Sequence, residues 1–356
     1  MTHRRRIVAL AAMGILMLAG CSSGTTGSGS SGTTGSGGTS KSGEKPIIGV
    51  IQITQTHGYQ QVLRDGYEAQ AKASGADVRF CVNDLDPGKT VSCAENLMSG
   101  GAKVLIVAPG DKGSFDAVVQ TAKARNVIVI NDGSPQGISP DFVPFTGTDS
   151  FIGGTLAGEY AAKWIKTNLG GSATVAELTL PAFTDCVQRN EGFKKGLQDA
   201  LPDAKIVASA DGEGQRAKAL PAMENMLQGN PKINVVFGCN DDSAIGALSA
   251  LVSANKPVDQ TLVLGFDGTA EAFDQIKKGG MFRVDVVQRP DCYSRLMMVN
   301  AVKLAKGEIT VQQLVDDGLY LIKTPVVTSD NVDAWLKWDG TPETAPEKCV
   351  RTATRS

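Results

Sequence analysis

The sequence predicts an α/β protein built from two lobes, each a doubly wound parallel sheet covered by helices. Short β-branched runs that are apolar throughout alternate with segments of helical period, which is typical of strands that helices bury on both faces. With 356 residues, the chain has room for roughly two domains. Nine strands would make one unusually long sheet, so we favour two.

Nine runs are expected to form these strands, joined by Gly, Pro, Asp or Asn. In chain order they are residues 47–53, 77–82, 103–107, 127–131, 174–178, 205–210, 233–238, 262–266 and 282–287. Two helical faces between them are formed by Phe115, Val118, Val119 and Ala122, and by Ile152, Thr155, Leu156 and Tyr160. No equally clean strand precedes the second face, so we place the first passage between the lobes near residues 147–150.

Residues 1–20 have the order of an export signal peptide. Arg4 to Arg6 precede an apolar run over residues 7–18, which is too short to span a bilayer. The run ends in Leu-Ala-Gly-Cys at residues 18–21, which resembles the lipobox of bacterial lipoproteins, where the signal is cut before the cysteine that carries the lipid. We therefore predict lipidation at Cys21, against the alternative of a buried N-terminal helix. Residues 21–45, rich in Gly, Ser and Thr, are expected to be a flexible tether that reaches about 25 Å.

Composition argues against several classes of function. The formal charge of −2 leaves no basic surplus for nucleic acid. Removal of the signal would leave His57 as the single histidine, which disfavours Ser-His-Asp and multi-histidine metal sites. We therefore expect a protein without enzymatic activity, cofactor or metal.

Polar residues follow the strands at the ends where open parallel sheets bind ligands. His57, Tyr59 and Gln60 lie in the loop after the first run, and Arg189 begins a helix after the fifth. The other polar groups at strand ends are Asp132, Asn240, Asp267 and Gln288. Planar amide, carboxylate and guanidinium groups bind adjacent hydroxyls, and a tyrosine ring packs against C–H bonds. Together these residues predict a site for a small carbohydrate or polyol.

Each of these residues also has a structural interpretation. Asn and Asp after a strand are typical turn residues and helix caps. Arg189 would then pair with Glu191 or Asp199 on a solvated helix face, His57 would be a bystander, and Tyr59 would pack at a helix start. Agreement among five strand ends favours a site, because capping requires neither an arginine nor a glutamine.

An ordered set of motifs over residues 46 to about 335 resembles the type I periplasmic sugar-binding proteins, the ribose-binding group. The motifs are Gly66 in LRDG, VINDG (129–133), TDSFIGGTLAGEYAA (148–162), RNEGF (189–193), NDDSAIGAL (240–248), LGFDGT (264–269) and VVQRPD (286–291). The ligand-contact pattern of that family matches at Asp132, Arg189, Asn240, Asp267 and Gln288. Three places depart from it: residues 57–60 are His-Gly-Tyr-Gln where ribose binders show Asn-Pro-Phe-Phe, Gly133 replaces an arginine, and Gly214 replaces an aromatic residue. A different pentose, a tetrose or a linear polyol is therefore as plausible as ribose.

The resemblance also implies an organisation and a mechanism. The N-terminal lobe would comprise residues 46–148 with 289–319, the C-terminal lobe residues 149–288 with 320–338, and residues 339–356 a tail. Three crossings would form a hinge, and the lobes would close on the ligand. We expect a monomer, anchored to the membrane outside the cytoplasm, that delivers its ligand to the permease of an ABC transporter. The alternative is a sugar sensor that presents ligand to a membrane receptor kinase.

The six cysteines besides Cys21 show no CxxC spacing, and an even number in an exported chain is typical of disulfides. Cys81 lies near the end of a strand, and Cys93 lies about one and a half turns into the helix that should run back across it, so both are at similar height. We predict a Cys81–Cys93 disulfide, against two buried thiols. The other four cysteines allow three connectivities, including a meeting of Cys186 and Cys239 at the cleft.

One further motif suggests a different class of protein. Residues 212–217 read Gly-Glu-Gly-Gln-Arg-Ala, a GxGxxA sequence between a strand and a helix, which resembles a dinucleotide-binding loop. We weigh it below the sugar site, because it lies in the middle of the chain and an exported lipoprotein meets little nicotinamide cofactor.

Overall fold

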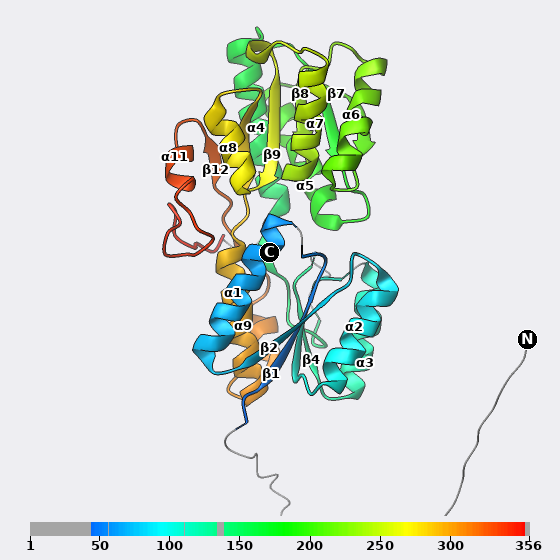
Figure 1. The fold of residues 1–356 in the computed structure, drawn as a ribbon, viewed down its shortest axis with the longest axis vertical. Coiled ribbons are helices and arrows are strands. Elements are labelled where there is room, and N and C mark those ends of the chain that lie inside the picture. The colour runs from blue at the N-terminus through cyan, green and yellow to red at the C-terminus, as the bar shows by residue number, and fades with distance from the viewer. Residues whose placement is uncertain (1–43, 56, 110, 134–138, 353–356) are drawn as a thin grey trace, which may run out of the picture. The chain divides into compact units, whose positions relative to one another are not determined.

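The first sheet and its helices form an N-terminal lobe. The computed structural model describes residues 44–55, 57–109, 111–133 and 139–352. The sheet has the order β2-β1-β3-β4 with all neighbours parallel. Its strands are β1 (Ile47–Gln52), β2 (Asp77–Val82), β3 (Val104–Val107) and β4 (Ile128–Asn131). Helices α1 (Gly58–Ser74) and α9 (Pro290–Lys306) cover one face, and α2 (Pro87–Ser99) and α3 (Lys112–Ala124) cover the other (Figure 1).

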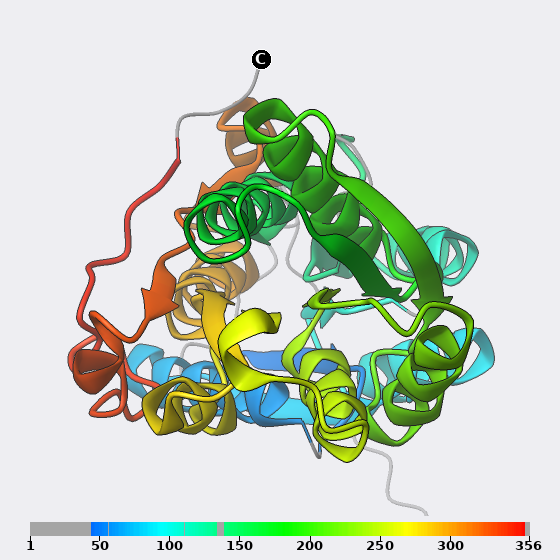
Figure 2. The same cartoon turned by 90° about the horizontal axis from the view of Figure 1, so that it is seen from above.

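The second sheet forms a C-terminal lobe and has the order β12-β10-β9-β8-β6-β7. Its strands are β6 (Thr174–Thr179), β7 (Lys205–Asp211), β8 (Val235–Gly238), β9 (Leu262–Asp267), β10 (Phe282–Val287) and β12 (Val326–Thr328). All neighbours are parallel except β10 and β12. One face is covered by α4 (Ser150–Asn168) and α5 (Thr184–Ala200), and the other by α6 (Arg216–Gly229), α7 (Asp241–Ser253) and α8 (Ala270–Lys278) (Figure 2).

The chain passes between the two sheets after β4, after β10 and after α10 (Val311–Asp316). The first and third passages contain β5 (Thr146–Thr148) and β11 (Tyr320–Ile322), which pair in parallel as a separate ribbon. The remaining short elements are η1 (Val258–Gln260) and α11 (Val332–Trp335). The doubly wound α/β class is therefore confirmed, with the carboxyl ends of both sheets at the connections that join them.

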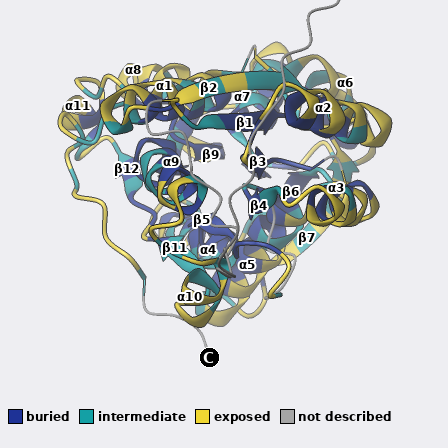
Figure 3. Ribbon diagram, turned by 90° about the horizontal axis from the view of Figure 1, so that it is seen from below, coloured by how far each residue is buried: buried dark blue, intermediate teal, exposed yellow. Residues whose placement is uncertain are grey.

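Strands in the middle of both sheets are buried, as their apolar runs predict, and the helices expose their outer faces (Figure 3). The expectation that helices bury both faces of a strand is wrong for β2 and β7. In β7 every second residue is exposed, and Val207 keeps 45% of its surface accessible. Both strands lie at sheet edges, where one face extends past the covering helices.

The buried face of α4 also differs from the prediction. Ile152, Leu156 and Tyr160 are only partly buried, whereas the buried positions from residue 153 to 162 are all glycines and alanines. A Cβ at Gly154 would lie 2.1 Å from the carbonyl oxygen of Arg189, and one at Gly192 in α5 would lie 2.1 Å from the carbonyl oxygen of Phe151. The small residues therefore bring the α4 and α5 backbones into contact, which a hydrophobicity pattern does not register.

The C-terminal tail packs as far as residue 352. The Arg289 guanidinium donates to the Glu347 carbonyl at 2.6 Å, and the Thr352 amide donates to the Leu321 carbonyl at 2.8 Å. Between these contacts Cys349 lies at bonding distance from Cys292 at the start of α9, with S–S 1.93 Å. The tail thus runs along the connections between the lobes. The expected signal peptide, Cys21 and the tether up to residue 43 lie outside the described residues.

Candidate functional site

A cavity of about 530 Å³ lies between the carboxyl ends of the two sheets and is lined from both lobes. Eight residues that the sequence singles out all line it: His57, Tyr59, Gln60, Asp132, Arg189, Asn240, Asp267 and Gln288. Seven of them come from strand ends or from the first turn of the following helix, where a parallel sheet collects polar groups. Contact of these side chains with a ligand stays a prediction.

Asp267 is the centre of the polar groups in the C-terminal lobe. Its Oδ1 accepts from Arg189 Nη1 at 3.2 Å and from Gln288 Nε2 at 2.7 Å, and all three side chains are buried. The backbone of Asp267 has φ 145°, a conformation rare for any residue but glycine. Such local strain, next to Gly268 at φ 87°, directs the carboxylate at the end of β9 into the cleft.

Arg189 is held from several sides. Its Nη1 also donates to the Cys239 carbonyl at 2.8 Å, and its guanidinium lies 4.0 Å from the ring centre of Phe266. Burial lowers the pKa of Arg189, but Asp267 and neighbouring groups outweigh this and raise it, so the guanidinium stays charged. Its Nε is buried without a hydrogen-bond partner among the described residues.

Asn240 is both a helix cap and a residue of the cavity wall. It is the N-cap of α7: its Oδ1 accepts from the Ser243 amide at 2.9 Å, while its Nδ2 donates to the Gly214 carbonyl at 2.9 Å. Its side chain also lines the cavity. The capping bond therefore fixes the orientation in which Asn240 faces the cleft.

Asp132 in the N-terminal lobe has no arginine beside it in sequence, since Gly133 follows. Tyr67 from α1 donates its hydroxyl to Asp132 Oδ2 at 2.7 Å. Burial raises the pKa of Asp132 to about 7, Asp185 contributes in the same direction, and the Tyr67 hydrogen bond opposes the rise. The ligand-free site thus contains a carboxyl group that is poised between its neutral and ionised forms.

Tyrosines form the wall of the cleft beside Asp132. The hydroxyls of Tyr59 and Tyr293 are in hydrogen-bond contact, and burial raises the pKa of both. Gln60 is buried next to them, and Gln52 donates to its carbonyl at 3.0 Å. Tyr59 and Gln60 therefore stand where the ribose pattern has two phenylalanines, and with Tyr293 they offer polar donors and acceptors here.

His57 links the two lobes across the cleft. Its Nε2 lies 3.6 Å from Asp242 Oδ2 and 3.7 Å from Asp267 Oδ2, both in the C-terminal lobe. The side chain is 17% exposed. It contacts groups of the site rather than standing apart as a bystander.

Several residues that line the cavity were not predicted from the sequence. Tyr293 lies in the first turn of α9, and Asp185 lies one turn before Arg189 on α5. Phe145 and Thr148 come from the first passage between the lobes. Asp185 could have been found from its i, i+4 spacing to Arg189, whereas Tyr293 has no local signal, because α9 reaches the cleft only through its packing on α1.

The glycine-rich loop at residues 212–217 is part of the cleft wall. Gly214 adopts φ 63° and presents its carbonyl to Asn240. Arg216 pairs with Asp242 at 3.1 Å and Glu271 at 2.7 Å, so its charge is already neutralised within the lobe. Through these contacts the loop forms part of the wall of the cavity that the other polar residues line.

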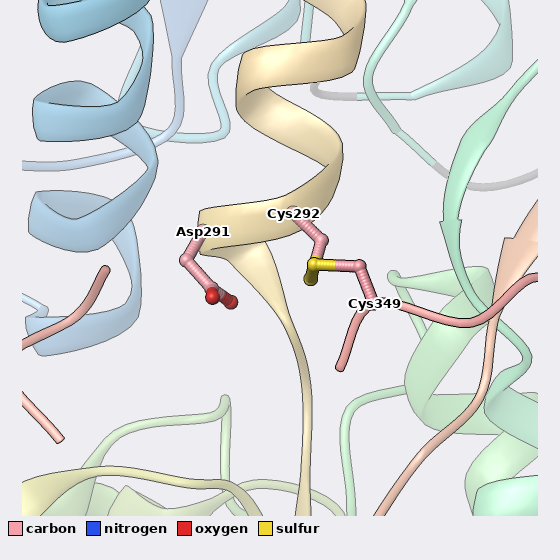
Figure 4. Close-up of side chains that lie close together, drawn as sticks. All are labelled: Asp291, Cys292 and Cys349. Carbon is pink, nitrogen blue, oxygen red and sulfur yellow. A yellow bond between two sulfur atoms is a disulfide. The ribbon is translucent and has the colours of Figure 1, made fainter. Parts of the chain in front are cut away.

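One group of described residues, Asp291, Cys292 and Cys349, has potential metal-ligand atoms within 4.8 Å of one another. Figure 4 shows the two sulfur atoms bonded to each other. The Asp291 carboxylate accepts from Arg289 Nε at 2.9 Å and Nη2 at 2.7 Å. The two sulfurs are thus bonded to each other and the carboxylate is paired with Arg289. This cluster therefore serves to hold the tail to α9 rather than to bind a metal.

Comparison with known proteins identifies the family. The sequence model of the periplasmic binding protein domain matches residues 48–309. The chain belongs to this family of type I periplasmic sugar-binding proteins. This binding protein is 32% identical to the ribose import binding protein RbsB of Bacillus subtilis over 76% of its own chain and 85% of the relative. It is 30% identical to RbsB of Escherichia coli over 74% of its chain and 86% of the relative.

Solved structures of other binding proteins share the fold of this one. A solute-binding protein of an ABC transporter from Mycobacterium smegmatis, with bound glycerol, has a TM-score of 0.73 and 25% identity and covers 84% of this chain and 99% of its own. The myo-inositol binding protein of Caulobacter has a TM-score of 0.73 and 26% identity and covers 82% and 96%. In the part of this binding protein that the structure describes, no helix is both long and apolar enough to cross a membrane.

Proposed function

We propose that this protein captures a small sugar or polyol in the cleft and delivers it to the permease of an ABC transporter. The observation that carries the proposal is the cavity of about 530 Å³, which lies within the usual size range of ligand sites and is lined by polar groups of both lobes. Relatives named for ribose import and a neighbour with bound glycerol support the same class of ligand.

The ligand we propose is neutral and rich in hydroxyls. Arg189, Gln288 and Asp267 offer donors and acceptors within one buried cluster, which suits adjacent hydroxyls. The tyrosine wall and Gly214 depart from the ribose pattern, which supports another pentose, a tetrose or a linear polyol beside ribose itself. The charged partners of Arg189 and Arg216 leave little free positive charge for an anionic ligand.

Binding and lobe closure would be the same event. A ligand shifts an equilibrium between open and closed forms only by its extra affinity for the closed form, which comes from touching both lobes. His57 supports this mechanism, since it reaches from the N-cap of α1 to Asp242 and Asp267. We propose lobes of residues 46–148 with 289–319 and 149–288 with 320–338, which rotate about the passages that contain β5 and β11.

We further propose that the protein acts outside the cytoplasm as a monomeric, non-enzymatic lipoprotein. The order of charged start, apolar run and Cys21 supports export and lipidation. The Cys81 and Cys93 sulfurs, 2.02 Å apart, support a disulfide, which an oxidising compartment would favour.

A thermal-shift screen followed by calorimetry tests the proposal. The full chain with Cys21→Ser would be titrated with D-ribose, D-allose, myo-inositol, erythritol, xylitol and glycerol. A ligand at 100 times its dissociation constant adds about 2.7 kcal/mol to the stability of the folded state. Stabilisation by one of these compounds, and lost uptake of that compound in a deletion strain, would support the proposal. A protein that none of the six compounds stabilises would contradict the ligand class.

A further inference from the structure

Two cysteines that belong to neither S–S pair meet beneath the ligand cleft. Cys186 lies in the first turn of α5, and Cys239 directly follows β8. Both side chains are buried, with 2% and 0% of their surface accessible, and their sulfur atoms are 2.6 Å apart. A disulfide bond measures about 2.03–2.05 Å, so this separation is close to, but longer than, that of a formed bond. In this structure both are free thiols whose sulfur atoms lie next to each other.

We propose that Cys186 and Cys239 form a third disulfide, which cross-links two elements that carry the ligand site. The inference goes beyond sugar binding and does not depend on it. Cys186 precedes Arg189 by about one turn of α5, and Cys239 precedes Asn240 in the chain. Arg189 Nη1 donates to the Cys239 carbonyl at 2.8 Å, so the cross-link and this hydrogen bond tie the same two backbone segments together.

The reaction is a thiol–disulfide exchange, with a protein disulfide of an exported oxidoreductase as the oxidant. One thiolate attacks the oxidant's disulfide to give a mixed disulfide. The second thiolate displaces the oxidant's sulfur, so the S–S bond forms, and the oxidant takes two electrons and, by way of water, the two thiol protons, and becomes a dithiol. Both sulfurs are buried in the folded protein, so the exchange takes place during folding, before the start of α5 packs against the end of β8. Burial, together with the neighbouring Cys186, raises the pKa of the Cys239 thiol, which disfavours its thiolate in the folded protein and agrees with bond formation before burial.

The cross-link would rigidify the ligand site without joining the two lobes. Both cysteines lie in the C-terminal lobe, so lobe closure stays free, while the start of α5 stays fixed to the end of β8. An occupied cleft would cover Cys186. We therefore expect bound ligand to slow reduction of this bond.

A thiol count and a peptide map test the bond directly. The full chain with Cys21→Ser, exported and purified without reductant, retains six cysteines. Alkylation in denaturant should find no free thiol, and a non-reducing digest should give one fragment pair that joins Cys186 to Cys239. Two free thiols that map to Cys186 and Cys239, or either cysteine bonded to another partner, would overturn the proposal.

A stability measurement provides the second test and needs no ligand. The reductant tris(2-carboxyethyl)phosphine should lower the unfolding midpoint of this protein by several degrees more than that of the Cys186→Ser, Cys239→Ser variant, which keeps the other two cysteine pairs. Equal shifts would show that the pair contributes no cross-link. If the variant fails to fold, reoxidation of the reduced wild-type chain with oxidised glutathione decides, since recovery of only two disulfides would contradict the proposal.

Discussion

At the scale of single residues, the site depends on carboxylates whose partners differ between the lobes. Asp267 is neutralised by Arg189 and hydrogen-bonded by Gln288, so it is a preorganised acceptor. Asp132 has a tyrosine in place of a cation and is correspondingly sensitive to pH. Two predictions follow from this asymmetry.

Removing either member of the Asp267–Arg189 pair should weaken ligand binding. Asp267→Ala and Arg189→Ala each delete hydrogen bonds to a charged group, of roughly 1.5–3 kcal/mol each, so we expect at least a tenfold loss of affinity in calorimetry. The exposed residues Asp203 and Arg125 provide matched controls, since Asp203→Ala and Arg125→Ala change the same residue types far from the cavity. Wild-type affinity in a cleft variant would exclude that residue from the site.

Asp132 should make the stability of the ligand-free protein fall as the pH rises. Its pKa is raised from 3.8 in the unfolded chain to about 7 in the folded protein. Between these values the folded protein keeps a proton that the unfolded chain has lost, so the free energy of unfolding decreases with pH and levels off above 7. Urea unfolding of wild type and Asp132→Asn should differ by an amount that changes on the order of 4 kcal/mol over this range.

Tyr67→Phe provides the control for that measurement. The Tyr67 hydroxyl donates to Asp132 and lowers its pKa, so the variant should move the pH-dependent decrease to higher pH. A difference between wild type and Asp132→Asn that does not change with pH would contradict the raised pKa.

At the scale of elements, glycines position the arginine of the site. α4 and α5 pack backbone to backbone, and the carbonyl of Arg189 occupies the space that a side chain on Gly154 would need. The motif TDSFIGGTLAGEYAA therefore serves close helix packing. This contact between the helices therefore determines where Arg189 lies in the site.

Gly154→Ala should reduce both stability and ligand affinity. Its Cβ would lie 2.1 Å from the Arg189 carbonyl oxygen, so the helices must separate, at a cost of about 1–3 kcal/mol in the free energy of unfolding. Gly229→Ala is the matched control, because Gly229 ends α6 and no atom lies within 4 Å of the added Cβ. Urea unfolding and calorimetry measure the two effects, and equal behaviour of the two variants would refute the packing argument.

At the scale of the whole described fold, the C-terminal tail is an additional connection beside the hinge. Trp335 is buried in the C-terminal lobe. The tail then continues to Cys349, which is bonded to Cys292 at the start of α9 in the N-terminal lobe. Residues 350 to 352 finally pair with β11. The tail is thus part of the folded protein, and it must accommodate any rotation of the lobes.

Cys349→Ser should lower the thermal unfolding midpoint. Loss of a cross-link between residues 57 apart in the chain costs about 2–4 kcal/mol in typical proteins. Cys292→Ser should give the same decrease in calorimetry, because either change removes the same bond. A midpoint equal to that of the wild type would mean that the tail adds nothing to stability.

Much of this protein could be predicted from short-range patterns. Apolar runs, helical spacing and polar strand ends are local properties, and they were sufficient to predict the fold class and eight residues that line one cavity. The edge strands and the glycine-lined face of α4 were mispredicted, because burial at a sheet edge and close helix contact depend on neighbours rather than on hydrophobicity.

The remaining features depend on residues far apart in the chain. Tyr59 and Tyr293, separated by 234 positions, share a hydrogen bond because α9 packs beside α1. Cys186 and Cys239 lie 53 positions apart and meet because the start of α5 packs against the end of β8. The pKa of Asp132 likewise reflects burial and a tyrosine 65 positions away. Such contacts have no local signal, since folding alone brings these side chains together and removes them from water.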